Sequence, residues 1–456
     1  MINPIRLNEL CGFYEPAFFR MHVSTTEPIV RLNELSPESF GILVHEYIHF
    51  IQDLTTIYGL TNVYETVQFL KYALNRIYTS GDCFSVPIIP DRETFYGRMI
   101  RFSSTLRNTT YGGHKQYTPV VIERYQRKTI KVEEHCNQDS LVAVELEMLV
   151  NGKDRTKYNF GACCIFESMA YLLEQHLMGG KKELSDMPYH AAKKVAEHIY
   201  KEFAEDDLRV LALCDISLNS SNPGDIFVSL LEGWRDESFL PENPRELYDY
   251  LYKQTFVINE ETDKGTVIRY ETFFGQYGNT ITLVRESLHS YFKDEEIHSN
   301  EKSLIISLIN QWIDEILQSA LKWRKEHPYF LLDIAEEGGQ ASNKAFYELF
   351  NEFGLPFCTN DSHEGCFYHP RINSSDLQLN LFLVVGQIYK ILDDKPVACK
   401  LQEYCYKCKE DRTGDVEPDK RCLSPWLRAS DKQLCPFAFV WRHWNLAGRE
   451  PVTPLY

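Results

Sequence analysis

The distribution of apolar residues near the N-terminus indicates short strands followed by one long buried helix. Short β-type runs occupy 18–23 and 29–32. Ser36-Pro37-Glu38 comes next and has the features of a helix start, because serine caps a first turn and proline fits the first helical position. The apolar residues that follow fall on more than one helical face. We therefore predict a buried helix over 37–58, ended by Gly59.

The rest of the chain is predicted to be mostly helical. Alternation from Leu141 to Val150 predicts β-structure within 117–151, and an apolar segment of helical length over 160–177 ends at Gly179-Gly180. Other periodic segments predict helices over 63–78, 92–107, 188–204, 206–216, 223–235, 243–254, 273–293, 299–326 and 341–353. A late strand is predicted over 376–388, before a loop-rich tail. The predicted fold class is α+β, predominantly α-helical, with a small N-terminal β-sheet.

His45-Glu46-Tyr47-Ile48-His49, inside the predicted long helix, has the spacing of a zinc site. Histidines four residues apart lie one turn apart on one helical face, so both imidazoles can reach one Zn²⁺. Glu46 is placed to accept a proton from a water that the metal activates. The alternative is an exposed helix face that carries two solvated histidines, but the neighbouring residues are too apolar for such a face. We predict one catalytic zinc, bound by His45 and His49, with Glu46 as general base.

A catalytic zinc needs a third protein ligand and an open fourth position. Glu167 is the best candidate, because it interrupts an otherwise apolar helical segment; the alternatives are Glu174, His176 and His114.

With Phe166-Glu-Ser-Met-Ala-Tyr downstream, the histidine motif resembles the gluzincin type of zincin metallopeptidase, whose third ligand is a helical glutamate followed by small residues. The similarity covers two short helices, separated by 117 residues between His49 and Glu167. It implies a zincin-like catalytic domain over 1–240. A helical domain over 241–355 and a cysteine-rich segment over 356–456 would follow.

Three further carboxylates are candidates for holding a ligand histidine in place. Asp53 follows His49 by four residues, as an aspartate does in thermolysin-like patterns, and Glu174 lies two turns beyond Glu167. Asp215 lies in an apolar run. It could orient a ligand histidine or, as an equal alternative, form a hydrogen bond with a nearby loop. Hydrolysis also needs a donor to the developing oxyanion. The candidates, without preference, are Tyr111, His114, Tyr117 and Tyr171.

The C-terminal segment is rich in cysteine. Seven of the 13 cysteines fall between 358 and 435. Cys405 and Cys408, with Cys422 and Cys435, have the elements of a structural four-cysteine zinc site. The alternative is a set of reduced thiols packed in a loop-rich cap. Further potential ligands are Cys358, His363, Cys366, His369 and Cys399.

Charge and composition narrow the classes of partner. The net charge of −17 makes the chain a poor candidate for non-specific binding to nucleic acid. No apolar run is long enough to span a bilayer, and no secretory signal is visible, so we expect a cytoplasmic protein without a membrane partner.

The expected function is that of a zinc metallopeptidase acting on protein or peptide substrates, with any regulatory partner unidentified. The alternatives are a non-enzymatic interaction protein with structural zinc sites and a zinc hydrolase of a non-peptide bond.

Overall fold

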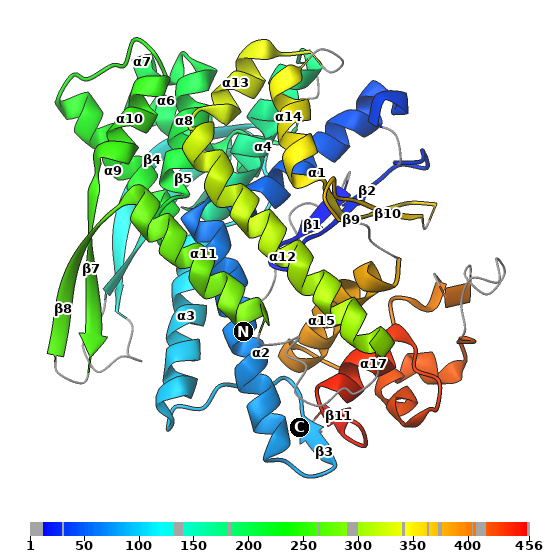
Figure 1. Ribbon diagram of the computed structural model, residues 1–456. Coiled ribbons are helices and arrows are strands. Elements are labelled where there is room, and N and C mark those ends of the chain that lie inside the picture. Colours follow the sequence, from blue (N-terminus) through cyan, green and yellow to red (C-terminus); the bar gives the residue numbers. More distant parts are fainter. Residues whose placement is uncertain are drawn as a thin grey trace.

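The computed structural model describes residues 12–29, 32–131, 140–180, 184–262, 265–289, 300–339, 343–362, 364–372, 376–403, 405–406 and 416–453. Its helices are α1 (Pro37–Thr55), α2 (Ile57–Tyr78), α3 (Phe95–Tyr111), α4 (Ala162–Met178), α5 (Asp186–Tyr189), α6 (Ala191–Ile199), α7 (Lys201–Ala204), α8 (Asp207–Ser217), α9 (Pro223–Asp236), α10 (Arg245–Lys253), α11 (Phe273–His289), α12 (Asn300–Glu326), α13 (Phe330–Glu337), α14 (Lys344–Phe353), α15 (Asp376–Asp393) and α17 (Pro436–His443). Its strands are β1 (Gly12–Glu15), β2 (Arg20–Val23), β3 (Cys83–Ser85), β4 (Val120–Lys131), β5 (Ser140–Val150), β6 (Asp154–Phe160), β7 (Thr255–Thr262), β8 (Gly265–Thr272), β9 (Leu355–Asn360), β10 (Gly365–Tyr368) and β11 (Glu450–Val452). The predicted α+β, predominantly helical class is confirmed (Figure 1).

The sheet nearest the histidine motif joins two distant parts of the sequence. Its strand order is β1-β2-β9-β10. The N-terminal hairpin pairs Phe13 with His22, and β2 runs parallel to β9, with Arg20 opposite Phe357. Figure 1 shows these strands together beside α1. The sheet therefore combines strands from the first and the last of the three predicted domains, a division that stays a prediction.

The long helix α1 begins where the sequence predicts. The Ser36 side chain accepts a hydrogen bond from the Ser39 backbone, and Pro37 occupies the first turn. The helix ends at Thr55, because the extended backbone of Thr56 breaks the chain direction and the Thr56 hydroxyl caps α2.

The prediction that Gly59 ends this helix is wrong, since Gly59 lies in the first turn of α2. A Cβ there would lie 2.5 Å from the backbone of Asp53, so this glycine allows the two helices to meet closely.

The C-terminal end of α1 is held by a buried polar network. Arg324 Nε donates to the Thr55 carbonyl at 2.8 Å, and the Tyr277 hydroxyl donates to the Leu54 carbonyl at 2.8 Å. The two Arg324 amino groups also bind the Asp215 carboxylate, and both side chains are fully buried. Carbonyls at a helix end have no partner within the helix, so α11 and α12 supply the donors that fix the end of α1, and Asp215 of α8 holds Arg324 in place.

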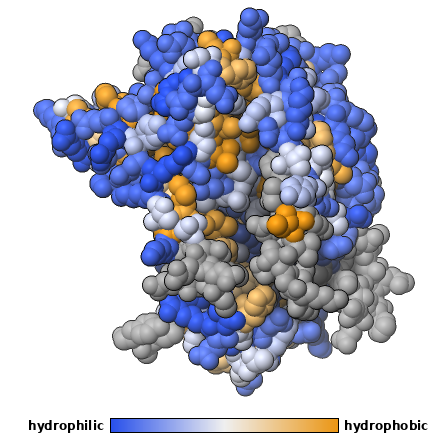
Figure 2. Space-filling model, turned by 90° about the vertical axis from the view of Figure 1, so that its left-hand side faces the viewer, coloured by the Kyte–Doolittle hydropathy of each residue, from blue (hydrophilic) through white to orange (hydrophobic). Residues whose placement is uncertain are grey.

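The other strands form separate sheets. Strands β4, β5 and β6 form an antiparallel sheet, as the alternation from Leu141 predicts, and β7 pairs with β8 as a hairpin. Figure 1 shows the β7–β8 hairpin extending from the helical body. On the face in Figure 2, hydrophobic side chains gather in small patches within a largely hydrophilic surface.

The predicted strand over 376–388 is wrong, because α15 spans Asp376–Asp393. Leucines at every second position from Leu377 to Leu383 imitate a strand, but leucine and glutamine favour helices and the segment is long. The predicted β-type run over 29–32 is also not a strand at the two positions that the structure describes. Ile29 lies in a turn, and Leu32 begins a short 3₁₀ helix. No helix in the described parts of the chain has the length and apolarity needed to cross a bilayer.

Candidate metal centre

His45 and His49 lie one turn apart on α1 and face helix α4. Both are buried, and their ring centroids are 5.0 Å apart. Glu167, on α4, brings its Oε2 atom to 3.1 Å from His45 Nε2 and 3.7 Å from His49 Nε2. Two imidazole nitrogens and one carboxylate oxygen thus converge on one point. Within the described residues, this is the only place where three potential metal ligands come within 4.8 Å of one another.

The electrostatics of this cluster favour a cation at its centre. Burial lowers the pKa of His45, but its hydrogen bonds to Glu167 and Glu174 outweigh burial and raise the pKa overall. Burial raises the pKa of Glu167, but its hydrogen bond with His45 and the nearby His49 ring lower the pKa overall. Both shifts have the direction expected where carboxylates favour positive charge, and a bound cation would be favoured there for the same reason.

The donor set fits a divalent metal. His49 Nε2 is buried and has no hydrogen-bond partner in the parts of the chain that the structure describes, which is costly for a polar atom unless something binds it. Two imidazoles and one carboxylate are a ligand set typical of catalytic zinc. The three side chains can therefore hold a metal ion with His45 Nε2, His49 Nε2 and Glu167 Oε2 as ligand atoms.

The outer nitrogen of each histidine is also bound. Glu174 Oε2 lies 3.1 Å from His45 Nδ1, as predicted for a carboxylate behind a ligand. A Cβ on Gly41, one turn before His45, would lie 3.3 Å from Glu174 Oε1, so the glycine avoids a tight contact with this carboxylate. The partner of His49 Nδ1 is Gln52 Oε1, at 2.7 Å, and Gln52 Nε2 donates to the Phe166 carbonyl on α4. These contacts hold both rings with Nε2 on the side of Glu167.

Asp53 does not hold a ligand histidine, contrary to prediction. Its Oδ2 atom accepts hydrogen bonds from the Tyr14 hydroxyl and the Ala17 backbone, both at 2.9 Å. One residue along a helix is a rotation of about 100°, so Gln52 faces His49 while Asp53 faces the turn after β1. Sequence reasoning missed Gln52, although its spacing of three residues from His49 is a usable signal.

Asp215 also differs from its predicted role. Its carboxylate binds Arg324, so it stabilises the end of α1 and does not orient a ligand histidine. The alternative, a hydrogen bond to a nearby loop, is also wrong, because Arg324 lies within α12. Arg324 provides the opposite charge that a buried carboxylate needs.

Glu46 is buried next to the ligand cluster. Its negative charge contributes to the raised pKa of His45. Strand β1 passes close to it, since a Cβ on Gly12 would lie 3.0 Å from Glu46 Oε1 and 2.6 Å from the His22 carbonyl. Gly12 therefore leaves the space that the Glu46 carboxylate occupies.

The four candidate donors to the developing oxyanion differ in burial and in the residues that they contact. Tyr111, at the end of α3, has a buried hydroxyl for which the described residues offer no hydrogen-bond partner. Burial, Cys163 and Glu167 raise its pKa. His114 is exposed, Tyr117 pairs through its backbone with Met187, and the Tyr171 ring packs on His190. His45 has another aromatic neighbour, Tyr189, with ring centroids 6.0 Å apart, which sequence reasoning missed.

The other proposed metal ligands lie outside the three-residue cluster. Glu174 contacts the outer nitrogen of His45, while His114 and His176 are not among the converging ligands of the described residues.

In the cysteine-rich segment, the Cys399 backbone donates to the Cys422 carbonyl at 2.7 Å. Burial, together with neighbouring Cys435, Cys405 and Cys422, raises the pKa of the Cys399 thiol to about 12. Cys408 and His363 lie outside the described residues. A structural zinc on Cys405, Cys408, Cys422 and Cys435 therefore stays a prediction.

Comparison of the chain with protein-family models, with curated proteins and with solved structures finds no match.

Proposed function

We propose that this chain is a zinc-dependent metallopeptidase with a zincin-like catalytic centre of the gluzincin type. The observation that carries the proposal is the convergence of His45 Nε2, His49 Nε2 and Glu167 Oε2 beside a buried Glu46. A zinc ion held there would supply Lewis acidity, polarising the scissile carbonyl and lowering the pKa of a water.

Glu46 is the proposed general base. It lies next to His45 in the sequence and is close enough to influence the protonation of that histidine. It would take a proton from the attacking water and return it to the leaving amine. A purely structural zinc site has no need of such a group. Tyr111, whose hydroxyl has no partner among the described side chains and whose pKa is raised in part by Glu167, is the proposed donor to the developing oxyanion.

A peptide is the proposed substrate because of the position of strand β1. Among the described strands, β1 forms one edge of its sheet, and Gly12 at its start lies against Glu46. An edge strand offers backbone donors and acceptors to an extended peptide, whose carbonyl would then pass near the base.

The test is hydrolysis of a mixed set of internally quenched fluorescent peptides by zinc-loaded protein. Glu46→Gln keeps the size of the side chain but removes the base, so kcat/KM should fall on the order of 10²- to 10⁴-fold with zinc still bound. Glu38→Gln is the matched control, since Glu38 is an exposed residue of the same helix. We expect Glu38→Gln to retain the activity of the unaltered protein.

Two results would contradict the proposal. Equal activity of Glu46→Gln and the unaltered protein would remove Glu46 from the chemistry. No peptide hydrolysis by fully zinc-loaded protein would favour one of the alternatives, a structural zinc protein or a hydrolase of another bond.

A further inference from the structure

Two cysteines face one another across the antiparallel strands β9 and β10. Cys358 is paired with Cys366 in the register of these strands, and both are free thiols in the structure. Residues directly opposite in an antiparallel pair have Cα atoms about 4.5–5.5 Å apart and side chains on the same face. Cysteines joined by a disulfide have Cα atoms about 4.4–6.8 Å apart. The backbone pairing therefore places the two cysteines within the range that a disulfide needs.

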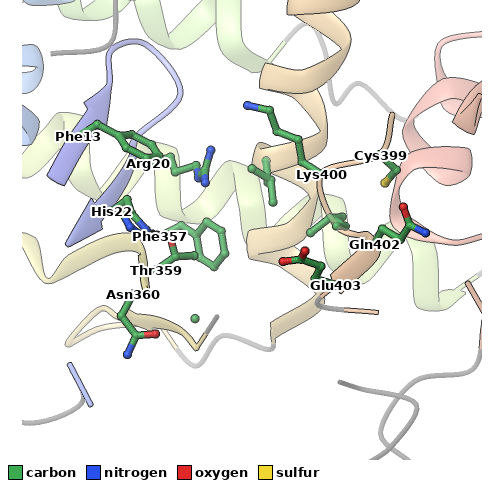
Figure 3. A pocket seen from close by; sticks show the side chains of 13 residues that line it. Phe13, Arg20, His22, Phe357, Thr359, Asn360, Cys399, Lys400, Gln402 and Glu403 are labelled. Carbon is green, nitrogen blue, oxygen red and sulfur yellow. Dashed lines mark hydrogen bonds between the residues drawn. The ribbon is translucent and has the colours of Figure 1, made fainter. Parts of the chain in front are cut away.

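Cys358 lies on the face of the sheet that is turned toward α1. Neighbouring side chains along a strand point to opposite faces. Phe357 and Thr359, on either side of Cys358, line a cavity on one face of the sheet (Figure 3), so Cys358 points to the other face. Burial raises the pKa of its thiol, and the nearby Cys366 and Glu46 raise it further. The pair is therefore on the same side of the sheet as the candidate metal centre.

The two cysteines differ in their exposure to solvent. Cys358 is fully buried, whereas Cys366 is partly exposed. Among the described strands, β10 forms one edge of its sheet, so a small molecule can reach Cys366 from solvent. Because reaction of a thiol requires access, Cys366 can react first and Cys358 second.

The positions favour a disulfide that is readily reduced again. Directly opposed residues have Cβ atoms about 4.5–5.5 Å apart, whereas those of a disulfide are about 3.5–4.5 Å apart. The two strands must therefore move closer together. The register shift between Cys366 and Tyr368 interrupts the pairing of β10 there, which eases such a movement. Strained disulfides are the labile ones, typical of reversible regulation.

We propose that Cys358 and Cys366 are a redox-sensitive thiol pair, which a small-molecule disulfide such as glutathione disulfide converts to a cross-strand disulfide. The Cys366 thiolate attacks one sulfur of the small molecule, and the other half leaves and takes up a proton. Cys358 then gives up its proton and displaces the second half, which also leaves as a thiol. The protein loses two electrons and two protons, and the small molecule gains them. This chemistry does not depend on the proposed peptidase activity.

The test is peptide mapping by mass spectrometry, after the reduced, folded, full-length protein is incubated with glutathione disulfide. Remaining thiols are alkylated as the protein is denatured, before digestion with trypsin. Cys358 and Cys366 are the only cysteines of the tryptic peptide 345–371. We expect this peptide to carry no alkyl group and to be lighter than its reduced form by the two hydrogens lost. Dithiothreitol added before alkylation should reverse the change.

Variants test the order of the two steps. Cys358→Ser lacks the second thiol, so a mixed disulfide with glutathione should accumulate on Cys366. Cys366→Ser should leave Cys358 reduced, because burial shields it. Cys83 is exposed on β3 and does not belong to the pair, so Cys83→Ser is the matched control. It should form the cross-strand disulfide as the unaltered protein does.

Either of two results with the unaltered protein would overturn the proposal, whatever the folding of the variants. The first is a peptide 345–371 that stays fully alkylated under conditions in which the exposed Cys83 has formed a mixed disulfide. The second is a mixed disulfide that persists on Cys366, because Cys358 would then not reach it.

Discussion

Glu174 Oε2 lies 3.1 Å from His45 Nδ1, on the side of the imidazole away from the nitrogen that faces Glu167. Both ring nitrogens lie next to carboxylates of α4, so one helix supplies a candidate metal ligand and the group that orients the His45 ring. Gly41 leaves the room that this arrangement needs.

Glu174→Ala should weaken zinc binding by about 10- to 100-fold, because His45 loses the acceptor that orients its ring. Glu174→Gln should lose less, since its amide oxygen can still accept from Nδ1. The measurement is a competition titration against a chromophoric chelator. Equal zinc affinity of Glu174→Ala and the unaltered protein would show that Glu174 has no influence on the metal.

Gln52→Ala should weaken zinc binding and lower the melting temperature. Gln52 links His49 Nδ1 to the Phe166 carbonyl, so its loss frees the ligand ring and breaks a contact between α1 and α4. Asp53→Asn is the matched control, because asparagine can still accept from Tyr14 and Ala17 and the residue does not contact His49. The same chelator titration compares the two variants. A larger loss of zinc affinity in Asp53→Asn than in Gln52→Ala would reverse our assignment of the two roles.

Arg324→Met should lower the free energy of unfolding by about 3–5 kcal/mol, because it leaves the Asp215 carboxylate buried without its cation. It also removes the donor to the Thr55 carbonyl. The double variant Asp215→Leu with Arg324→Met should be more stable than Arg324→Met alone, since no buried charge remains. Chemical denaturation of the three proteins measures this. A single variant as stable as the unaltered protein would contradict the role given to this pair.

The free energy of unfolding should fall in mild acid because of His369. Burial, with a further contribution from Arg371, lowers the pKa of His369 to about 4. Its Nδ1 accepts from the Arg371 backbone at 3.3 Å, so protonation there would break this contact. An unfolded histidine titrates near pH 6.5. The unfolded state therefore binds more protons between about pH 6.5 and 4, and stability from this residue, full above pH 6.5, falls as the pH drops.

His369→Leu should remove this dependence. The difference in unfolding free energy between the unaltered protein and the variant should change by on the order of 2 kcal/mol between pH 7.5 and pH 5. Denaturation at the two pH values gives this difference, and comparing the proteins at each pH cancels the titration of all other groups. A constant difference would contradict the lowered pKa.

The local part of the candidate site could be predicted from the sequence. The spacing of His45 and His49 and the apolar surroundings of Glu167 are local signals, and the structure brings all three side chains together. The start of α1 could also be predicted, because the Ser36 cap and Pro37 affect the backbone within a single turn.

The parts that could not be predicted depend on contacts between distant residues. Strand β2 pairs with β9, and no local pattern specifies that Arg20 lies opposite Phe357. In the same way, nothing near Asp215 in the sequence indicates that Arg324 is its partner. The prediction of a strand in the region of α15 was wrong because the two-residue spacing of its leucines was given more weight than helix propensity and segment length.

The central claim is that His45, His49 and Glu167 bind a zinc ion beside a general base. The most direct measurement is the zinc content per chain of the purified protein, of Glu167→Ala and of Glu46→Gln, by elemental analysis. We predict that Glu167→Ala contains one zinc fewer than the unaltered protein and that Glu46→Gln contains the same amount. Equal zinc in Glu167→Ala and the unaltered protein, or no zinc in the unaltered protein, would contradict the account.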